Sequence, residues 1–457
     1  MRSKFVAAAL GALFSLSGLV LGADTDQTAW QAGLARVDIT PQGPIAMSGY
    51  GPRVSEGVLD RLEAKALLLI DSDGHRGLLL TADLLFFRQP FAEELCRRIM
   101  AETGLQREQI LLNASHTHSG PVFGLKDPER FDLSASEREV VDAYTGELME
   151  KLVGLAVQAG KKLEPARLHY GVGGPVGFAM NRRKMTDRGV VMAPNPEGPV
   201  DRGVPVLRVD DPDGELRAVV FGCACHNVTL GGDRRKISAD YAGAAQRYIE
   251  KARPQATALF MSGCGADANS HPRGGPEQEK LVARHGETLG SEVCRVLDGE
   301  LASLRGPLRT LLHWTELPLR HDYTRDELAQ LAGAGSSYWH CRNAQGLLAL
   351  LDAGKPLPKQ YRAAISLWRF GDDLTFVGLP GEGPADYVRM IGDALKPDRL
   401  WVASFCNESF GYLPTASILA EGGHESMCLT LEIGFFAPSV ERVVVDTVER
   451  LARKAGR

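Results

Sequence analysis

The sequence predicts an α/β protein in which mixed β-sheets are flanked by helices, with its functional site at the carboxyl ends of strands. Two patterns predict this class: short apolar runs that end in polar residues or glycine, and stretches of helical periodicity between them. Composition agrees, because 457 residues with 44% hydrophobic and 24% charged side chains are typical of a folded globular chain with ample length for a large core.

Six apolar runs are expected to form strands. They cover 78–87, 110–114, 216–225, 257–263, 374–380 and 400–406. In α/β sheets the ligand usually lies beyond the carboxyl ends of the strands, because each strand delivers its next residues into one crevice. The residues that directly follow these runs are therefore the first candidates for function.

Three stretches have helical periodicity, at 91–103, 142–163 and 383–395, and the TRDE at 324–327 predicts a capping box at the start of another helix. The segment from about 320 to 365 is more polar and helical than its surroundings. It could form an insertion or a lid. We find no internal repeat, low-complexity tract or clear linker.

The first 23 residues are typical of a secretory signal peptide. Arg2 and Lys4 precede an apolar stretch that ends at Leu21, and small residues follow, so we expect cleavage near Ala23 and a secreted or periplasmic protein. No later segment approaches the roughly 18 uninterrupted apolar residues that a spanning helix needs. We therefore expect no transmembrane segment after processing, and one catalytic domain over 24–457.

Charge and cysteine content narrow the function further. Lysines and arginines number 52 against 57 acidic residues, a net charge of −5, and this balance argues against nucleic acid as a partner. Export would allow the eight cysteines to form disulfides, but their connectivity cannot be read from the sequence. Cys223 and Cys225, beside His226, could be soft metal ligands, although small core residues on a strand are favoured. The oligomeric state is left open.

Four side chains after predicted strands fit a zinc site: His116, His226, Glu382 and Tyr412. Neutral imidazole and carboxylate oxygen suit Zn²⁺, and a catalytic site keeps one position open for water or substrate. Each residue alone has a structural interpretation: a hydrogen-bonded core histidine, a glutamate accepting turn amides, a core aromatic. Their shared position at strand ends favours one Zn²⁺ per chain over these separate interpretations.

The chain also resembles the catalytic domain of the neutral, non-lysosomal ceramidases, zinc-dependent amidases that split N-acylsphingosine. The resemblance covers nearly all of the expected mature chain. Matching segments are DITP (38–41), GY (49–50), SHTHSGP (115–121), MNRR (180–183), CHNVT (225–229), PGE (380–382) and GYLPT (411–415). HTHSGP followed by PGE and then GYLPT is a fairly specific combination, whereas DITP or NRR alone would be weak.

The resemblance implies roles for individual residues. It makes His116, His226, Glu382 and Tyr412 the zinc ligands, and it makes His118 a group that supports the ligands or polarises the carbonyl oxygen. Arg182 would contact the polar head of the substrate or the developing oxyanion. Its alternative is a surface arginine beside Arg183 and Lys184.

Two departures from the family pattern matter. Where ceramidases carry a GD.SPN motif with a catalytic serine, this chain reads GADANSHPR, so Asn269 takes the place of the serine when Asp267 is aligned. A second family tyrosine would fall at His424. Asparagine is not a nucleophile, so the expected chemistry is attack by zinc-bound hydroxide, with His118 or His424 polarising the carbonyl or moving the proton.

Two acidic residues have open roles. Asp267 could orient a ligand histidine or cap a turn. Asp240, in SADYAG, could do the same as Asp267, although an N-cap at a helix start is favoured.

We therefore expect an exported zinc-dependent hydrolase that cleaves an amide (N-acyl) bond. The alternatives are the same metal site acting on an ester or sugar derivative, or a non-catalytic homologue that binds a metal or ligand. The family's C-terminal β-sandwich domain is not expected here, because the sequence stops at Arg457 soon after the final predicted helix. Ceramide itself is not favoured as the substrate; shorter or more polar N-acyl compounds, such as acylated amino sugars or amino acids, fit an exported enzyme equally well, so a lipid and an acylated amino sugar both stay open.

Overall fold

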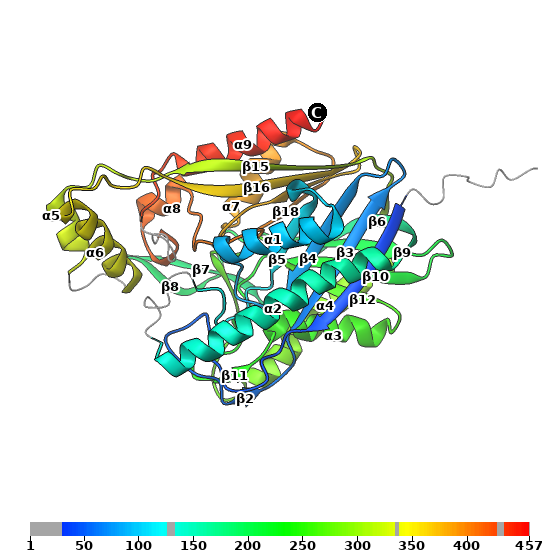
Figure 1. Ribbon diagram of the computed structural model, residues 1–457, viewed down its shortest axis with the longest axis horizontal. Coiled ribbons are helices and arrows are strands. Elements are labelled where there is room, and N and C mark those ends of the chain that lie inside the picture. Colours follow the sequence, from blue (N-terminus) through cyan, green and yellow to red (C-terminus); the bar gives the residue numbers. More distant parts are fainter. Residues whose placement is uncertain (1–29, 126–132, 334–337, 427–433, 457) are drawn as a thin grey trace, which may run out of the picture.

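The computed structural model of the protein describes residues 30–125, 133–333, 338–426 and 434–456. The predicted signal peptide lies outside these residues. The described chain forms four layers: helices, a large mixed sheet, a smaller mixed sheet, and helices again (Figure 1). This arrangement confirms the predicted fold class of mixed sheets flanked by helices.

The larger sheet has nine strands within the described residues, in the order β12-β10-β9-β6-β1-β3-β4-β5, with β14 paired to β6. Its strands are β1 (Trp30–Asp38), β3 (Glu63–Asp71), β4 (Arg76–Ala82), β5 (Ile110–Ala114), β6 (Leu163–Gly173), β9 (Val204–Asp210), β10 (Leu216–Cys223), β12 (Thr257–Ser262) and β14 (Ala302–Leu304). Most neighbours are antiparallel, but β4 pairs with β5 and β10 pairs with β12 in parallel.

The smaller sheet has the order β15-β16-β17-β18, and β17 and β18 are parallel. Its strands are β15 (Leu308–Pro318), β16 (Gln360–Phe370), β17 (Leu374–Gly378) and β18 (Leu400–Ala403). Short strands form two further sheets, β13-β7-β8 and β11-β2. They are β2 (Gly57–Val58), β7 (Ala179–Thr186), β8 (Gly189–Asn195), β11 (Lys236–Ile237) and β13 (Ala268–Ser270).

The helices in the described part of the chain are α1 (Gln89–Thr103), α2 (Ala135–Lys161), α3 (Asp240–Ala252), α4 (Gln278–Leu297), α5 (Arg325–Leu331), α6 (Tyr338–Asp352), α7 (Asp386–Leu395), α8 (Ala416–Glu421) and α9 (Val440–Lys454), with the short 3₁₀ turns η1 (Arg107–Gln109) and η3 (His424–Ser426). Helices α1, α2, α3, α4, α7 and α9 pack on the outer faces of the two main sheets, whereas α5 and α6 pack on each other. Among the described helices, none combines the length and apolar character needed to cross a membrane.

Separate hydrophobic clusters fill the spaces between the layers. Side chains of α1 and α2 pack on β1, β3, β4 and β5, and α3 and α4 cover β9, β10 and β12. Between the two sheets, Trp368, Phe376 and Trp401 meet leucines of the larger sheet, and α7 and α9 cover the outer face of the smaller sheet. Figure 1 shows α9 lying along β15 and β16.

All six predicted strands are present, but only 110–114 has the predicted end. The others stop earlier: the run 78–87 forms a strand only to Ala82, and 400–406 only to Ala403. The apolar residues beyond these ends stay buried in loops that turn towards the site, and apolar character alone cannot separate a buried loop from a strand. The capping box is confirmed, because the Thr324 side chain accepts from the Glu327 N–H at the start of α5.

The segment 320–365 contains α5 and α6, a pair of helices inserted between the antiparallel strands β15 and β16. These helices share a small hydrophobic cluster of their own, and Figure 1 shows them projecting from one end of the molecule. A role for this segment as a lid stays a prediction.

Candidate functional site

Asn113, near the end of β5, joins three segments that carry predicted site residues. Its fully buried side chain donates from Nδ2 to the Ser404 carbonyl at 2.8 Å and accepts the Ser262 N–H on Oδ1 at 3.0 Å. Ser262 ends β12 and Ser404 follows β18, so this single amide links both edge strands of the larger sheet to the smaller one.

The strand directions show why this link matters. Five antiparallel pairings separate β5 from β10 along the larger sheet, so these strands run in opposite senses. Parallel strand direction therefore does not bring their carboxyl ends together. The predicted meeting of strand ends is present because the two edge strands, β5 and β12, approach each other through Asn113 and Ser262.

Backbone carbonyls hold His116 and His226 in a single tautomer. His116 Nδ1 lies 2.9 Å from the Leu85 carbonyl, and His226 Nδ1 lies 2.9 Å from the Gly265 carbonyl. Because a carbonyl can only accept, each Nδ1 carries the proton and each Nε2 keeps its lone pair. Burial lowers the pKa of both rings, to about 3 for His116, so both are neutral near pH 7.

The backbone around these rings takes uncommon conformations. His116, Phe405 and Asn407 have φ values of 58°, 57° and 64°, in the left-handed region that residues other than glycine rarely adopt. The Phe405 ring centroid lies 4.2 Å from that of His116. Strained backbone of this kind tends to cluster at functional sites, where the surrounding structure enforces it.

Glu382 and Tyr412 come from two loops that pair with each other. The Glu382 N–H donates to the Gly411 carbonyl at 2.8 Å, and the Leu413 N–H donates to the Glu382 carbonyl at 2.9 Å. Gly381 has a φ of 69° and leaves no room for a Cβ, which would lie 2.8 Å from the Phe410 ring. The PGE sequence therefore needs its glycine to bring the carboxylate into the site.

The Glu382 carboxylate faces the Nε2 atoms of both histidines. Its Oε2 lies 3.2 Å from His226 Nε2 and 3.5 Å from His116 Nε2. His226 Nε2 and Glu382 Oε2 are buried and have no hydrogen-bond partner in the described part of the chain. Two acceptors that face each other in a buried site repel unless a cation lies between them.

The donor atoms also have the spacing of a metal site. Donors bound about 2.0–2.1 Å from one tetrahedral Zn²⁺ lie roughly 3.3 Å apart. The two distances from Glu382 Oε2 bracket this value. His116, His226 and Glu382 therefore fit a zinc ion by spacing and protonation state, and His226 Nε2 and Glu382 Oε2 add two unpaired lone pairs.

His118 lies beside this group but is held differently. Its Nε2 is 3.1 Å from His116 Nε2, and its ring packs edge-on against Tyr50, with centroids 5.1 Å apart. Burial lowers its pKa well below the usual value. Among the described residues its Nδ1 has no hydrogen-bond partner, so no carbonyl fixes its tautomer as in His116 and His226.

The ligand atoms of His116, His118 and His226 lie within 4.8 Å of one another, so the side chains offer two donor sets. One contains three histidines, and the other contains His116 and His226 with Glu382. The second set has the two anchored rings and the unpaired carboxylate oxygen, which favours it.

Arg182, on β7, is buried and makes three side-chain hydrogen bonds. Its Nε donates to Glu425 Oε1 at 2.7 Å, Nη1 donates to Asn269 Oδ1 at 2.9 Å, and Nη2 donates to Tyr412 Oη at 3.0 Å. The side chain is only 6% exposed, so the surface-arginine alternative is wrong. Asn269, which stands where the family has its serine, thus binds the Arg182 guanidinium through its amide oxygen.

His424 packs its ring against Tyr412 with centroids 5.3 Å apart, and burial lowers its pKa.

The two candidate acidic residues bind backbone. Asp267 accepts the Ala385 N–H at 3.1 Å, and its other oxygen lies 3.3 Å from Asn181 Nδ2. It therefore supports the loop after Glu382, as a turn cap would, and burial raises its pKa to about 6. Asp240 is the first residue of α3 and accepts the Leu230 N–H at 2.9 Å, and Ala239 is the N-cap, so the favoured N-cap interpretation of Asp240 is wrong.

Three residues that help to build the site were not singled out from the sequence: Asn113, Phe405 and Glu425. Asn113 gave a signal, because an amide inside the apolar run ILLNA must find buried partners. The sequence around Phe405 and Glu425 gave no signal of a role in the site. A phenylalanine at a strand end and a glutamate in GGHES have ordinary surroundings in the sequence.

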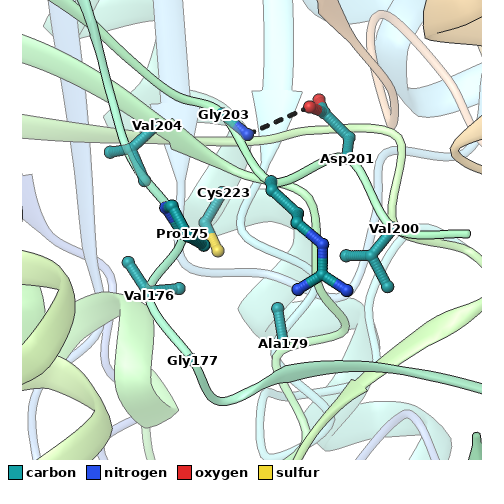
Figure 2. Close-up of a pocket in the computed structure, with 10 residues that line it drawn as sticks. Pro175, Val176, Gly177, Ala179, Val200, Asp201, Gly203, Val204 and Cys223 are labelled. Carbon is teal, nitrogen blue, oxygen red and sulfur yellow. Dashed lines mark hydrogen bonds between the residues drawn. The ribbon is translucent and has the colours of Figure 1, made fainter. Parts of the chain in front are cut away.

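A separate hollow contains none of the predicted site residues. It is lined by Pro175, Val176, Gly177, Ala179, Val200, Asp201, Arg202, Gly203, Val204 and Cys223 (Figure 2). Burial raises the pKa of the Cys223 thiol to about 12, so this sulfur is a poor nucleophile. Cys223 and Cys225 are free thiols packed in the core under α3 and α4, as the favoured structural interpretation predicted.

Glu408 supports the loop that leads to Tyr412 and gives a test of stability against pH. Its carboxylate accepts from Tyr361 Oη at 2.7 Å and Gln89 Nε2 at 3.0 Å, but burial outweighs these bonds and raises its pKa to about 7. Between about pH 4.5 and pH 7 the Glu408 carboxyl therefore stays protonated in the folded protein but ionises in the unfolded chain. The free energy of unfolding should fall across this range by up to about 3 kcal/mol because of Glu408 alone.

Glu408→Gln should remove this part of the pH dependence. In urea unfolding with metal chelated, we expect the loss of stability between pH 5 and pH 8 to be smaller in the variant than in the parent. Glu139→Gln, at an exposed position, is the control and should follow the parent. Identical pH dependence in Glu408→Gln and the parent would contradict the raised pKa.

The fold and the site together define a mixed α/β protein with buried histidines and a carboxylate that could hold a metal ion. The sequence model of the neutral/alkaline non-lysosomal ceramidase N-terminal domain matches residues 30–294, more than half of the chain. This chain belongs to that family.

Individual relatives agree with this assignment. Neutral ceramidase A of Dictyostelium discoideum is 26% identical over 240 residues, which cover 50% of this chain and 32% of the relative. Neutral ceramidase of Pseudomonas aeruginosa is 25% identical over 356 residues, which cover 73% of this chain and 52% of the relative. The chain thus spans about half or less of the length of these relatives.

The crystal structure of neutral ceramidase from Pseudomonas aeruginosa has a similar fold. The TM-score is 0.71 at 19% identity, and the match covers 93% of this chain and 75% of the other. At this level of identity, the likeness supports the fold alone.

Proposed function

We propose that this chain is a zinc-dependent amidohydrolase that cleaves an N-acyl bond. The observation that carries the proposal is the pair of buried, unpaired acceptors, His226 Nε2 and Glu382 Oε2, which lie 3.2 Å apart. His116, His226, Glu382 and Tyr412 would hold one Zn²⁺. Family membership supports an amide as the bond that is cleaved.

When bound, Zn²⁺ would acidify a water molecule and polarise the carbonyl of the substrate. The chain's own groups do the rest. Neutral His118 can donate its Nε2–H to the carbonyl oxygen of the amide, because Nε2 lies 3.1 Å from the lone pair of His116 Nε2 and therefore carries the ring proton, whereas Nδ1 is the unpaired acceptor. Arg182 keeps a positive charge beside Tyr412 Oη, and burial of the surrounding residues excludes water.

The hairpin that follows Arg182 supports a substrate with an apolar acyl chain. Met185 on β7 and Met192 on β8 are 60% and 47% exposed, and they lie on one face of the hairpin because Met192 pairs with Arg183, two residues before Met185. They are two of the seven large hydrophobic side chains that are exposed in the described part of the chain. The sequence alone gave no expectation of such a surface. We propose a lipid or other long-chain N-acyl compound as the substrate, ahead of acylated amino sugars.

A panel of substrates tests this proposal. The purified protein, loaded with Zn²⁺, is incubated with N-acyl and O-acyl compounds of matched acyl length, from acetyl to palmitoyl, and release of amine or alcohol is measured. We expect amide hydrolysis that chelation abolishes and Zn²⁺ restores, with higher kcat/KM for the longer chains.

Each other outcome has a defined meaning. Turnover of esters and of no amide would favour the ester alternative, for which the replacement of the family serine by Asn269 is the supporting observation. Hydrolysis that survives complete removal of metal would contradict the proposed zinc dependence. Export is also a proposal, supported by the N-terminal sequence, and mature protein that begins at Met1 would contradict it.

A further inference from the structure

Glu425 is a buried carboxylate that the proposed chemistry does not use. It lies on η3 and is 2% exposed. Its Oε1 lies 2.7 Å from Arg182 Nε, and its Oε2 lies 2.7 Å from Arg183 Nη1. Each oxygen thus takes one guanidinium, and the carboxylate bridges two consecutive arginines of β7.

This bridge determines where Arg182 points. A guanidinium is planar and rigid, so fixing Nε also fixes the directions of Nη1 and Nη2. With Nε on Glu425, Nη1 reaches Asn269 Oδ1 and Nη2 reaches Tyr412 Oη. Rotation of Arg182 towards either partner alone would break the bond to the carboxylate.

A second carboxylate nearby provides a comparison within the same segment. Glu421 Oε2 lies 2.9 Å from Arg183 Nη2, and its side chain is 44% exposed. Glu421 thus binds Arg183 from the solvent side, whereas Glu425 binds both arginines from within. Only Glu425 can pass an effect directly to Arg182.

We propose that Glu425 is a positioning residue that holds the Arg182 guanidinium against Tyr412 and Asn269. For its catalytic consequence this inference rests on the proposed function. A positive charge that is already in position where the carbonyl oxygen becomes negative stabilises the transition state more than the bound substrate. Loss of Glu425 should therefore lower kcat with little change in KM.

The central variant is Glu425→Gln, which keeps the shape of the side chain but has one acceptor oxygen for two arginines. Glu421→Gln is the matched control. Kinetics are measured with the N-acyl compound of the panel that the parent hydrolyses fastest. We expect kcat to fall about 10–100-fold in Glu425→Gln, the usual cost of losing a supporting partner. In Glu421→Gln it should stay within about twofold of the parent.

A double variant tests whether Glu425 acts through Arg182. Residues that act as one unit have non-additive effects. We expect Arg182→Lys combined with Glu425→Gln to match Arg182→Lys alone within about twofold. A further loss of kcat in the double variant, equal to that of Glu425→Gln alone, would overturn the inference.

A crystal structure separates this inference from the proposed function. In Glu425→Gln crystals grown with Zn²⁺, we expect Arg182 Nη2 to lie beyond hydrogen-bond distance of Tyr412 Oη, against 3.0 Å here. An unchanged distance overturns the positioning role even if the variant is inactive. If the parent hydrolyses no N-acyl compound, the proposed function fails and this distance alone decides the positioning role.

Breaking a buried ion pair can prevent folding, so a second variant is needed. Glu425→Asp keeps the charge, but its side chain is one methylene shorter and withdraws the carboxylate from both arginines. If Glu425→Gln does not fold, the same distance in Glu425→Asp decides, with the same two outcomes.

Discussion

Replacing His226 with alanine should remove zinc from the protein and abolish amide hydrolysis. His226 Nε2 faces Glu382 Oε2 at 3.2 Å, and neither atom has a hydrogen-bond partner among the described residues. Loss of a group that merely supports a ligand weakens metal binding about 10–100-fold, so loss of a ligand should cost more than about 100-fold. Zinc per chain, measured by elemental analysis after gel filtration, should fall from one to a small fraction.

Two other histidines make this experiment decisive. His118→Ala should keep one zinc per chain but lose most of its activity, because His118 is expected to face the substrate. His313→Ala should change neither quantity, since His313 lies on β15 and belongs to neither group of possible metal ligands in the described part of the chain. Full zinc in His226→Ala would rule out the proposed ligand set. Equal zinc loss in His118→Ala would favour the three-histidine set instead.

The sequence was sufficient to predict the elements that deliver the site. His116, His226, Glu382 and Tyr412 all follow apolar runs, and the structure brings the two histidines and the carboxylate within 3.5 Å. Local pattern succeeds here because a strand needs only a few adjacent apolar residues to be recognised. The assignment of these side chains as zinc ligands stays a prediction.

What the sequence could not provide was the set of contacts made between distant segments. The sequence was equally compatible with Arg182 at the surface and Arg182 in the site. Only its burial between Glu425, Asn269 and Tyr412 decides between these two interpretations. Glu425 is separated from Arg182 by 243 positions, so no local pattern could pair them. The direction of β5 relative to β10 could not be predicted from the sequence either, because it depends on the pairing order of the whole sheet.

Gly265→Ala should damage both stability and metal binding, for a reason that the backbone makes plain. A Cβ at this position would lie 2.3 Å from the Cys225 nitrogen and 2.4 Å from the Ala224 carbonyl carbon. These are backbone atoms that cannot rotate away, so the two segments must separate. Overpacking of this kind costs about 1–3 kcal/mol, occasionally more, and here a rigid contact is forced apart.

The same shift would release His226, because the Gly265 carbonyl accepts its Nδ1 proton at 2.9 Å. We therefore expect a lower unfolding temperature together with weaker zinc binding in Gly265→Ala. Gly146→Ala is the matched control: Gly146 lies inside α2, and a Cβ added there would meet nothing within 4 Å, so the alanine should stabilise the helix by about 0.5–1 kcal/mol. If Gly265→Ala bound zinc as tightly as Gly146→Ala, the carbonyl would not be what orients His226. The position of the His226 ring would then depend on Glu382 and on bound Zn²⁺.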